Sequence, residues 1–443
     1  MNIEKFIVKG GHTLQGSVGV SGAKNVVLKA FVAACLTKDE VIIHNIPLIS
    51  DLRIMADIIR DLGGSVTIED HTARIKIEEF NKSEITLDQA SHIRTSSMFL
   101  APLLLRNKHA VIPNPGGCRL GARPIDRTID GLKQMGATIS YLSDDGFFHA
   151  TAQELHGMTY TFEKSTHTGT ETMIIAAVLA KGKTILQNAA EEPEIDELIA
   201  LLNSMGAKVK RTEHRVIEIE GVASLHGAEV TIKPDRNEVI TFAIAAVVTK
   251  GDILIKKATP EGLTAFLEKF EEAGGGVEET PEGMRFFYKN ILSATDVTTA
   301  PYPGFMTDWQ APWAVMMTQA KGTATIHEVV FENKLQYVGD LKKMGADATL
   351  FNPEVADKQS LYNFNLEDDR PEYYHAVRIV GPKKLHDAIV TMHDIRAGAA
   401  VLLAALAASG ETVIHNVHLI ERGYEQIEKR LNALGADIKR TSE

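Results

Sequence analysis

The residues best suited to chemistry lie in the segment 115–126, where Cys118 stands in a glycine-rich turn ahead of a predicted helix. Three glycines in this segment let backbone amides approach a ligand closely, and Arg119 and Arg123 place positive charge beside the sulfur. Cationic neighbours and a helix N-terminus both lower the pKa of a thiol, and the same surroundings attract phosphate or carboxylate. The segment therefore predicts a reactive thiolate beside an anion site. The alternative is a tight turn with a small buried thiol.

The composition is typical of a globular protein of two domains. With 443 residues, the chain is too long for one ordinary core. Of these residues 44% are hydrophobic and 24% charged. The formal net charge of -11 argues against a general nucleic-acid or anionic-membrane surface. Any phosphate site must therefore be local, and we expect neither nucleic acid nor membrane as a partner.

The chain has only two cysteines, without a CxxC motif or zinc-ligand spacing, which predicts a reducing cytoplasm rather than a disulfide framework. The second cysteine, Cys35, stands in an apolar run and is expected to be inert core. Residues 1–16 lack the apolar stretch of a signal peptide, and the small-apolar run 397–409 is too short to span a bilayer. Export and membrane insertion are not expected.

One ending recurs six times along the chain, a glycine that follows an amphipathic helix. The intervals between successive copies are 73, 70, 68, 71 and 90 residues. The last copy therefore carries about 20 extra residues, which we place at Asn352–Glu372 because this stretch is polar and interrupts no periodic segment. The repeated glycines are Gly63, Gly136, Gly206, Gly274, Gly345 and Gly435.

Each repeat is also expected to contain a second helix that is apolar nearly all round, followed by a strand. Four of these helices stand out, at 26–36, 170–179, 239–248 and 397–408. The unit reads strand, buried helix, strand, exposed helix, strand, strand. Because a helix that is apolar on every face must be covered by protein, each domain should enclose three such helices. The predicted fold is a two-domain inside-out α/β barrel of six βαβαββ units, three per domain.

At this point the sequence resembles the enolpyruvyl transferases, over nearly the whole chain. The sister family that acts on shikimate phosphate lacks the cysteine loop. The segments that carry the resemblance are Ser21–Asn25, Gly116–Asp126, Pro234–Arg236, Thr307–Asp308, Phe331–Asn333, Asp394–Arg396 and Glu421–Tyr424.

The resemblance implies transfer of the enolpyruvyl group of phosphoenolpyruvate to the 3′-hydroxyl of UDP-N-acetylglucosamine with release of phosphate. This is the first committed step of peptidoglycan precursor synthesis, and it needs no metal or redox cofactor. The resemblance also implies a first domain of residues 22–233, a second of 1–21 and 234–443, and an active site in the cleft between them.

The resemblance assigns a role to each matching residue. Cys118 matches the acid, Asp308 the acceptor of the hydroxyl proton, and Asp394 a carboxylate near the reacting carbon. The positions that match phosphoenolpyruvate-binding residues are Lys24, Asn25, Arg123, Lys334, Arg396 and Arg422. Those that match the UDP-sugar side are Arg94, Pro124, Asp126, Thr307, Asp308 and Val330.

Three of these residues also have an ordinary structural explanation. Lys24 could be a solvated lysine at a helix start, Arg94 could pair with a local carboxylate, and Asp308 could be a helix N-cap. Arg422 precedes Gly423 at an expected helix start, where a cation is unfavourable unless an anion binds nearby.

Several positions depart from the family pattern. Thr128 stands where a histidine is usual, Lys334 replaces an arginine and Lys29 a proline, while residues 166–170 differ from the usual uridine-side loop. Two rival readings stay open. One is enolpyruvyl transfer to a different UDP-sugar, and the other is a catalytically silent paralogue that senses a nucleotide sugar.

Overall fold

The computed structural model describes residues 4–116 and 124–442, which form two compact units. The first unit comprises residues 22–116 and 124–233, and the second comprises residues 4–21 and 234–442. A backbone hydrogen bond lies on each side of the boundary: Ala23 N donates to Lys233 O at 2.9 Å in the first unit, and Asp235 N to Ser21 O at 2.8 Å in the second. Within the described ranges we find no helix with the length and apolar character that crossing a membrane requires.

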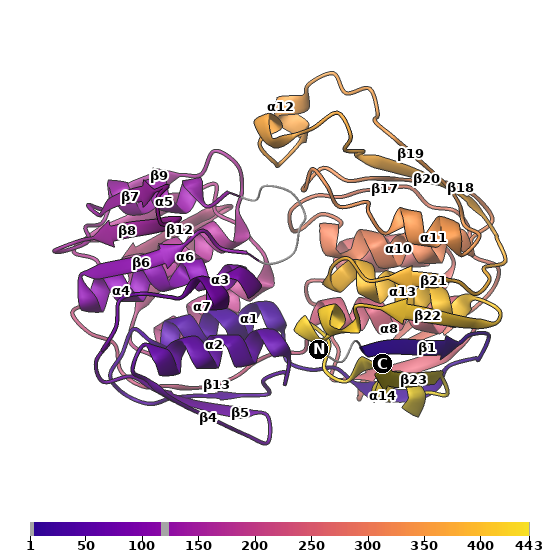
Figure 1. The fold of residues 1–443 in the computed structure, drawn as a ribbon, viewed down its shortest axis with the longest axis horizontal. Helices are drawn as coiled ribbons and strands as arrows, with labels where there is room; N and C mark the ends of the chain where they lie inside the picture. Colours follow the sequence, from indigo (N-terminus) through magenta and orange to yellow (C-terminus); the bar gives the residue numbers. More distant parts are fainter. Residues whose placement is uncertain (1–3, 117–123, 443) are drawn as a thin grey trace. The chain divides into compact units, whose positions relative to one another are not determined.

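The first unit alternates helices and short strands (Figure 1). Its elements are α1 (Lys24–Ala34), β3 (Val41–His44), α2 (Ser50–Asp61), β4 (Ser65–Glu69), β5 (Thr72–Lys76), α3 (Leu87–His92), η1 (Arg94–Phe99), α4 (Leu100–Asn107), β6 (His109–Pro113), α5 (Asp126–Gln134), β7 (Thr138–Leu142), β8 (Phe147–Thr151), β9 (Thr159–Thr161), α6 (His167–Ala177), β10 (Lys183–Gln187), α7 (Pro193–Ser204), β11 (Lys208–Glu213), β12 (Val216–Glu220) and β13 (Glu229–Thr231).

The second unit follows the same alternation and takes in the N-terminal strands. Its elements are β1 (Glu4–Lys9), β2 (Gln15–Gly19), α8 (Arg236–Val248), β14 (Asp252–Lys256), α9 (Thr264–Glu272), β15 (Gly275–Thr280), β16 (Gly283–Tyr288), β17 (Val297–Thr298), η2 (Thr307–Trp309), α10 (Gln310–Thr318), β18 (Gly322–His327), α11 (Val338–Lys343), β19 (Asp347–Phe351), α12 (Lys358–Leu361), η3 (Leu366–Asp368), β20 (Ala376–Gly381), β21 (Ile389–Thr391), α13 (Ile395–Ala407), β22 (Glu411–His415), η4 (Val417–Arg422), α14 (Ile427–Ala433) and β23 (Asp437–Ser442).

Five sheets share one topology, in which one edge strand runs parallel to its neighbour and the other pairs are antiparallel. Their orders are β13-β3-β5-β4, β11-β12-β10-β9, β15-β16-β14-β2, β17-β18-β20-β19 and β21-β22-β1-β23. The sixth, β6-β8-β7, has three strands, and Glu84 adds a parallel bridge to Val111 at its edge. The α/β class predicted from the sequence is confirmed. No sheet among the described residues closes on itself, so none of these sheets is a barrel, and the predicted barrel arrangement is not confirmed.

Buried helices form the centre of each unit. In the second unit α8, α10 and α13 pack against one another, and every residue of α8 and α10 is buried (Figure 1). In the first unit α6 contacts α4, α5 and α7, while α1 contacts η1 and α7. Each unit has its own large apolar core around these helices. This burial explains their sequences, because a helix covered on all sides has no polar face.

The central helices begin two or three residues earlier than their apolar runs suggest. α1 starts at Lys24, α6 at His167, α8 at Arg236 and α13 at Ile395, so their first turns contain polar residues. Apolar periodicity cannot mark such a turn, because its side chains serve contacts other than the core. The candidate-site residues Lys24 and Arg396 therefore stand on rigid, buried helices rather than on loops.

The six repeated glycines each follow the C-cap of an amphipathic helix, with φ between 89° and 106°. This left-handed backbone is strained for residues with a Cβ, and it reverses the chain so that a strand can follow.

Candidate active site

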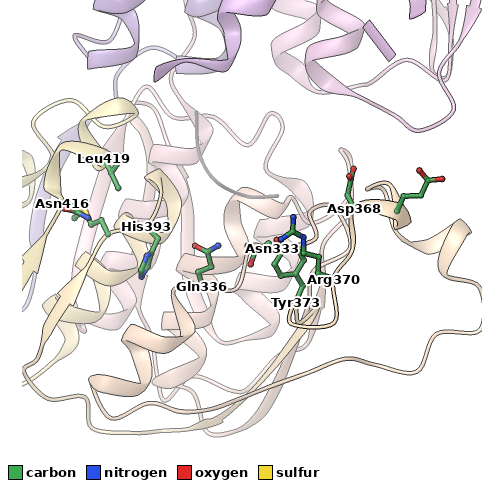
Figure 2. Close-up of a pocket in the computed structure, with 10 residues that line it drawn as sticks. Asn333, Gln336, Asp368, Arg370, Tyr373, His393, Asn416 and Leu419 are labelled. Atoms are coloured by element: carbon green, nitrogen blue, oxygen red, sulfur yellow. The ribbon is translucent and has the colours of Figure 1, made fainter. Parts of the chain in front are cut away.

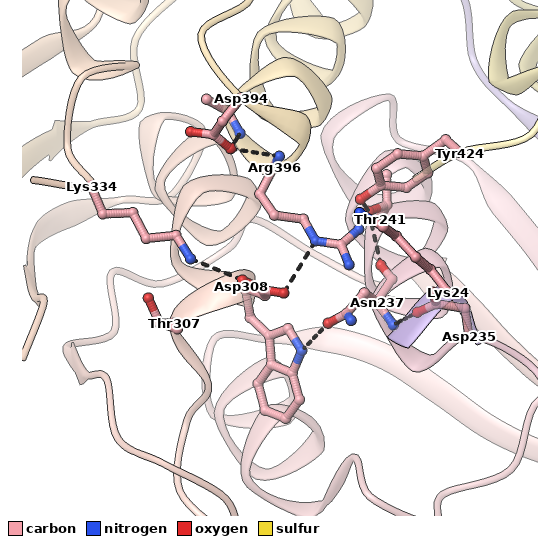
Figure 3. Close-up of polar contacts among 12 residues, drawn as sticks. Lys24, Asp235, Asn237, Thr241, Thr307, Asp308, Lys334, Asp394, Arg396 and Tyr424 are labelled. Carbon is pink, nitrogen blue, oxygen red and sulfur yellow. Dashed lines mark hydrogen bonds and ion pairs between the residues drawn. The ribbon is translucent and has the colours of Figure 1, made fainter. Parts of the chain in front are cut away.

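Asp308 lies between two cations in the second unit (Figure 3). Lys334 Nζ is 2.8 Å from Asp308 Oδ1, and Arg396 Nε is 3.4 Å from Asp308 Oδ2. The side chain of Lys334 is 2% exposed and that of Arg396 is 7% exposed, whereas that of Asp308 is 25% exposed. Burial raises the pKa of the Asp308 carboxyl, but the charges of Lys334 and Arg396 outweigh burial and hold that pKa well below its usual range. Asp308 is therefore an ionised carboxylate at neutral pH.

Three different elements bring this cluster together. Asp308 belongs to η2, directly before α10, and Arg396 lies in the first turn of α13. Lys334 follows β18 in a loop whose backbone is held by Gln310, which donates to Lys334 O at 3.3 Å. Met306 and Trp309, and not Asp308, occupy the N-cap positions here. Capping is thus not what holds Asp308 in place.

Arg396 has unused hydrogen-bonding capacity. Its guanidinium lies 5.3 Å from the ring centroid of Tyr424, whose hydroxyl is 2.8 Å from Thr241 Oγ1. Burial lowers the pKa of Arg396, yet Tyr424, Asp308 and Asp235 together raise it above its ordinary value, so the group stays charged. Among the described residues, none accepts a hydrogen bond from the buried Arg396 Nη1. Because a buried donor without an acceptor is costly, this atom is suited to a bound anion.

Asp394 caps the helix that carries Arg396. Its carboxylate accepts hydrogen bonds from Arg396 N at 2.8 Å and Ala397 N at 3.0 Å, and the residue is 7% exposed. A carboxylate at the N-terminus of a helix also interacts favourably with the helix dipole. Asp394 is therefore the N-cap of α13 and fixes the backbone at Arg396, and its catalytic assignment stays a prediction.

Glu328, which the sequence analysis missed, joins two residues assigned to the sugar side. It is fully buried, and its carboxylate accepts hydrogen bonds from Thr307 Oγ1 at 2.7 Å, Val330 N at 2.8 Å and Phe331 N at 3.0 Å. Thr307 and Val330 are thereby held together beside Asp308. The available signal was a charged residue directly after the strand-like run 322–327, where burial requires it to have partners.

The first unit holds a second group of candidate residues. Lys24 opens α1 and is 8% exposed, with Nζ 2.8 Å from Asp51 Oδ2. A solvated lysine is therefore excluded. Asn25, next in α1, is half-buried. Asp51 lies in the first turn of α2, where its charge also suits the helix N-terminus.

Arg94, Pro124 and Asp126 also come together in the first unit. Arg94 Nη2 donates to Pro124 O at 3.0 Å, and Asp126 is the first residue of α5. Ile125 is the N-cap, so Pro124 precedes the helix instead of occupying its first turn. Cys118 and Arg123 lie outside the described residues. The other thiol, Cys35, is buried, which raises its pKa to about 12, in keeping with an inert core residue.

The expected position of Arg422 is wrong. It is the last residue of the 3₁₀ helix η4, followed by the C-cap Gly423, and the next helix begins only at Ile427. A cation at a helix C-terminus is favourable, so the dipole argument for an anion near Arg422 does not hold. The error arose because η4 is too short to show helical periodicity.

Two departures from the family pattern meet in the first unit. Lys29 Nζ is 3.1 Å from Glu171 Oε2, and His167 Nε2 is 3.1 Å from Glu171 Oε1. Glu171 is fully buried, Lys29 is 6% exposed and His167 is 22% exposed at the side chain. Burial lowers the pKa of His167, but the carboxylates of Glu171 and Glu192 oppose burial, and the net pKa is raised. Thr128, the third departure, is buried in α5.

Comparison with known proteins identifies similar chains. The family described as EPSP synthase (3-phosphoshikimate 1-carboxyvinyltransferase) matches residues 8–431. The UDP-N-acetylglucosamine 1-carboxyvinyltransferase of Acidobacterium capsulatum is 40% identical, with 99% of this chain and 96% of the relative covered. The protein of the same name from Magnetococcus marinus is also 40% identical, with 99% of each chain covered.

Solved structures share the fold. The enolpyruvyl transferase NikO from Streptomyces tendae has a TM-score of 0.85 at 24% identity and covers 100% of both chains. EPSP synthase from Acinetobacter baumannii has a TM-score of 0.73 at 18% identity, with 98% of this chain and 99% of that chain covered. At these identities the likeness concerns the fold alone.

Proposed function

The chain belongs to the EPSP synthase family, and we propose on that basis how its residues divide the work of enolpyruvyl transfer. The enzyme transfers the enolpyruvyl group of phosphoenolpyruvate to the 3′-hydroxyl of UDP-N-acetylglucosamine, with release of phosphate, in peptidoglycan precursor synthesis. The main observation that supports the assignment of these roles is the cluster of Asp308, Lys334 and Arg396.

Asp308 acts as the base in this proposal. The sugar hydroxyl oxygen forms a bond to C2 of phosphoenolpyruvate, its proton passes to the Asp308 carboxylate, and C3 receives a proton to become a methyl group. Phosphate then leaves from C2, and loss of a proton from C3 restores the double bond. Cys118 is the proposed donor of the proton to C3. Only Asp308 among the two proposed groups lies within the described residues, and its ionised state suits the role.

Lys334 and Arg396 bind the anionic donor and control the strength of the base. Two cations beside Asp308 make it a weak base, because they stabilise its ionised form. Phosphoenolpyruvate bound to Lys334 and to Arg396 Nη1 shares their charge, which returns the pKa of Asp308 toward its usual range. Donor binding thus activates the base when the reaction can begin.

The remaining assignments complete the proposal. Lys24, Asn25, Arg123 and Arg422 assist in binding the donor, whereas Arg94, Pro124, Asp126, Thr307 and Val330 bind the nucleotide sugar. Each unit supplies part of this set, and the inside-out packing of six βαβαββ copies supplies the rigid helix starts. The shared topology of the five four-stranded sheets supports that packing. We place the enzyme in the cytoplasm, which the buried free thiol Cys35 supports.

The test is phosphate release from phosphoenolpyruvate, measured with and without UDP-N-acetylglucosamine. The unchanged chain should release phosphate only with the sugar, and Cys118→Ala and Asp308→Ala should each abolish release. Cys35→Ala is the control, because this thiol is buried in the apolar core of the first unit. Sugar binding without phosphate release by the unchanged chain would contradict the proposal and favour a silent paralogue. Phosphate release with another UDP-sugar, but not with UDP-N-acetylglucosamine, would mean that the other sugar is the acceptor.

A further inference from the structure

Residues 352–375, which we term the inserted segment, lie between β19 and β20, where the last repeat has its extra residues. The segment contains α12 and η3 and has an apolar cluster of its own, separate from the two main cores. Tyr362 is 2% exposed and Phe364 is 7% exposed, and both pack with Val329, which is 3% exposed. The segment is therefore a folded attachment to the second unit.

The cluster is built from aromatic contacts, a backbone hydrogen bond and a contact of 3.3 Å between the Tyr362 hydroxyl and His327 Nε2. The rings of Tyr362 and Phe364 stack with centroids 4.9 Å apart, and the ring of His375 lies 5.0 Å from that of Tyr362. Asn363 N donates to Val329 O at 2.8 Å. The inserted segment is thus joined to the residue immediately before Val330, one of the residues assigned to the sugar side.

The same short stretch, 329–331, is also held by hydrogen bonds to Glu328 of the candidate active site. Glu328 accepts hydrogen bonds from Val330 N and Phe331 N through one oxygen and from Thr307 through the other. The aromatic cluster and Glu328 therefore both fix the position of the 329–331 backbone. Removing either set of contacts should displace Val330.

Polar residues of the inserted segment also face a cavity of about 710 Å³ in the second unit (Figure 2). This volume is within the range of small-molecule sites. Asn333 and His393 in its wall are sequence neighbours of Lys334 and Asp394. The wall combines carboxylates and amides with a guanidinium, an imidazole and one tyrosine ring, so it offers both donors and acceptors to a hydroxyl-rich ligand. The lining residues are Asn333, Gln336, Glu367, Asp368, Arg370, Tyr373, Met392, His393, Asn416 and Leu419.

We propose that the inserted segment is an acceptor-binding element, which positions the 329–331 backbone through Tyr362 and Phe364 and walls a cavity for the hydroxyl-rich part of the nucleotide sugar. The inference rests on the proposed function. Tyr362 acts through Val329 and is a positioning residue, so its effect should fall on acceptor binding and leave donor binding and turnover almost unchanged.

Steady-state kinetics of three variants test the inference. Tyr362→Ala should raise KM for UDP-N-acetylglucosamine by about tenfold, the loss of one well-made contact, with kcat and KM for phosphoenolpyruvate within about threefold. Tyr362→Phe keeps the ring and should restore the KM of the unchanged chain. Leu361→Ala is the matched control, since this neighbouring side chain in α12 is 37% exposed and should have no effect.

Thermal unfolding and circular dichroism of each variant separate positioning from misfolding. If Tyr362→Ala fails to fold, Phe364→Leu keeps apolar volume while removing the ring stack and takes its place. Equal KM values for UDP-N-acetylglucosamine in Tyr362→Ala and Leu361→Ala would overturn the inference. An equal rise in the KM for UDP-N-acetylglucosamine and the KM for phosphoenolpyruvate in Tyr362→Ala would overturn it as well. No sugar-dependent phosphate release by the unchanged chain would instead refute the proposed function itself.

Discussion

Two charge clusters of this molecule each place one carboxylate between two nitrogen-bearing side chains, but they differ in exposure to solvent. In the second unit Asp308 lies between Lys334 and Arg396, and in the first unit Glu171 lies between Lys29 and His167. The side chain of Asp308 is 25% exposed, whereas that of Glu171 is fully buried. A carboxylate between two nitrogen bases is thus no sign of catalysis by itself.

The two clusters differ in whether their charged atoms are accessible to a ligand. In the second-unit cluster the carboxylate of Asp308 is 25% exposed, and Arg396 Nη1 has no acceptor among the described residues. In the first-unit cluster Glu171 is fully buried, and its two oxygens lie 3.1 Å from Lys29 Nζ and His167 Nε2 without a hydrogen bond among the described residues. The first arrangement can exchange a proton and bind an anion, and the second can only hold its own charges. Openness, more than charge, separates a reactive cluster from a structural one.

The largest expected effect comes from neutralising the open carboxylate. Asp308→Asn should lower kcat by about 10²- to 10⁴-fold, the usual contribution of a general base, and should weaken nucleotide-sugar binding far less, because the amide can still hydrogen-bond to the sugar hydroxyl. Phosphate release and calorimetric binding of UDP-N-acetylglucosamine measure the two effects. Asp252→Asn is the control, because that carboxylate accepts a hydrogen bond from Arg285 Nε at 2.8 Å at a more exposed site. Equal rates for the two variants would remove Asp308 from the mechanism.

Neutralising the closed carboxylate should cost stability instead of activity. Glu171→Gln should lower the free energy of unfolding by about 3–5 kcal/mol, because it leaves Lys29 buried without its counter-charge. Urea unfolding measures this loss, and the kcat of the folded fraction should not change. The double variant Lys29→Met with Glu171→Gln should recover most of the stability. A stable Glu171→Gln variant without activity would make this cluster functional and overturn the contrast.

The unpartnered donor of the open cluster provides a finer test. Arg396→Lys keeps the charge beside Asp308 but removes Nη1, so KM for phosphoenolpyruvate should rise about tenfold or more, as for loss of one charge-assisted hydrogen bond. Steady-state kinetics at saturating nucleotide sugar measure the change. Arg440→Lys, in the ion pairs with Glu4 and Glu421, should leave that KM unaltered. An unchanged KM for Arg396→Lys would mean that the donor binds elsewhere.

The smallest effect concerns the pH dependence of the closed cluster. The pKa of His167 is raised in the folded chain, so its protonated form stabilises the fold below about pH 6.5, its ordinary value, and this contribution disappears as pH rises through the folded pKa. The difference in urea midpoint between the unchanged chain and His167→Gln should therefore shrink from pH 5.5 to pH 8.5. Glu171, Lys29 and Glu192 are the charged groups facing His167 and stay unchanged in this comparison. A difference that grows with pH would reverse the sign of the coupling.

Sequence patterns predicted the local part of the fold well. The buried helices follow from continuous apolar runs, the amphipathic helices from a period of 3.6 residues, and the glycines that end them from left-handed backbone. All three signals depend only on near neighbours. Helix starts were less predictable, since Lys24, His167 and Arg236 stand in polar first turns. Arg422 was misplaced because a 3₁₀ helix of six residues is too short to show a detectable periodicity.

The candidate site was predicted residue by residue and not as an arrangement. The motif resemblance indicated Asp308, Lys334 and Arg396, but no pattern indicated that Glu328 joins Thr307 to Val330. Nor did any pattern indicate that Lys29 and His167, two separate departures from the family, share the carboxylate of Glu171.

The sequence by itself determined where helices end, which helices are buried and which residue types are available for anion binding and proton transfer. Only the tertiary structure decided which charges meet, since Asp308 is 26 residues from Lys334 and 88 from Arg396. It also decided that one carboxylate opens to solvent while another is enclosed. The physical reason is that helix and turn preferences act over a few residues, whereas ion pairing and desolvation depend on the packing of segments that are distant in the chain.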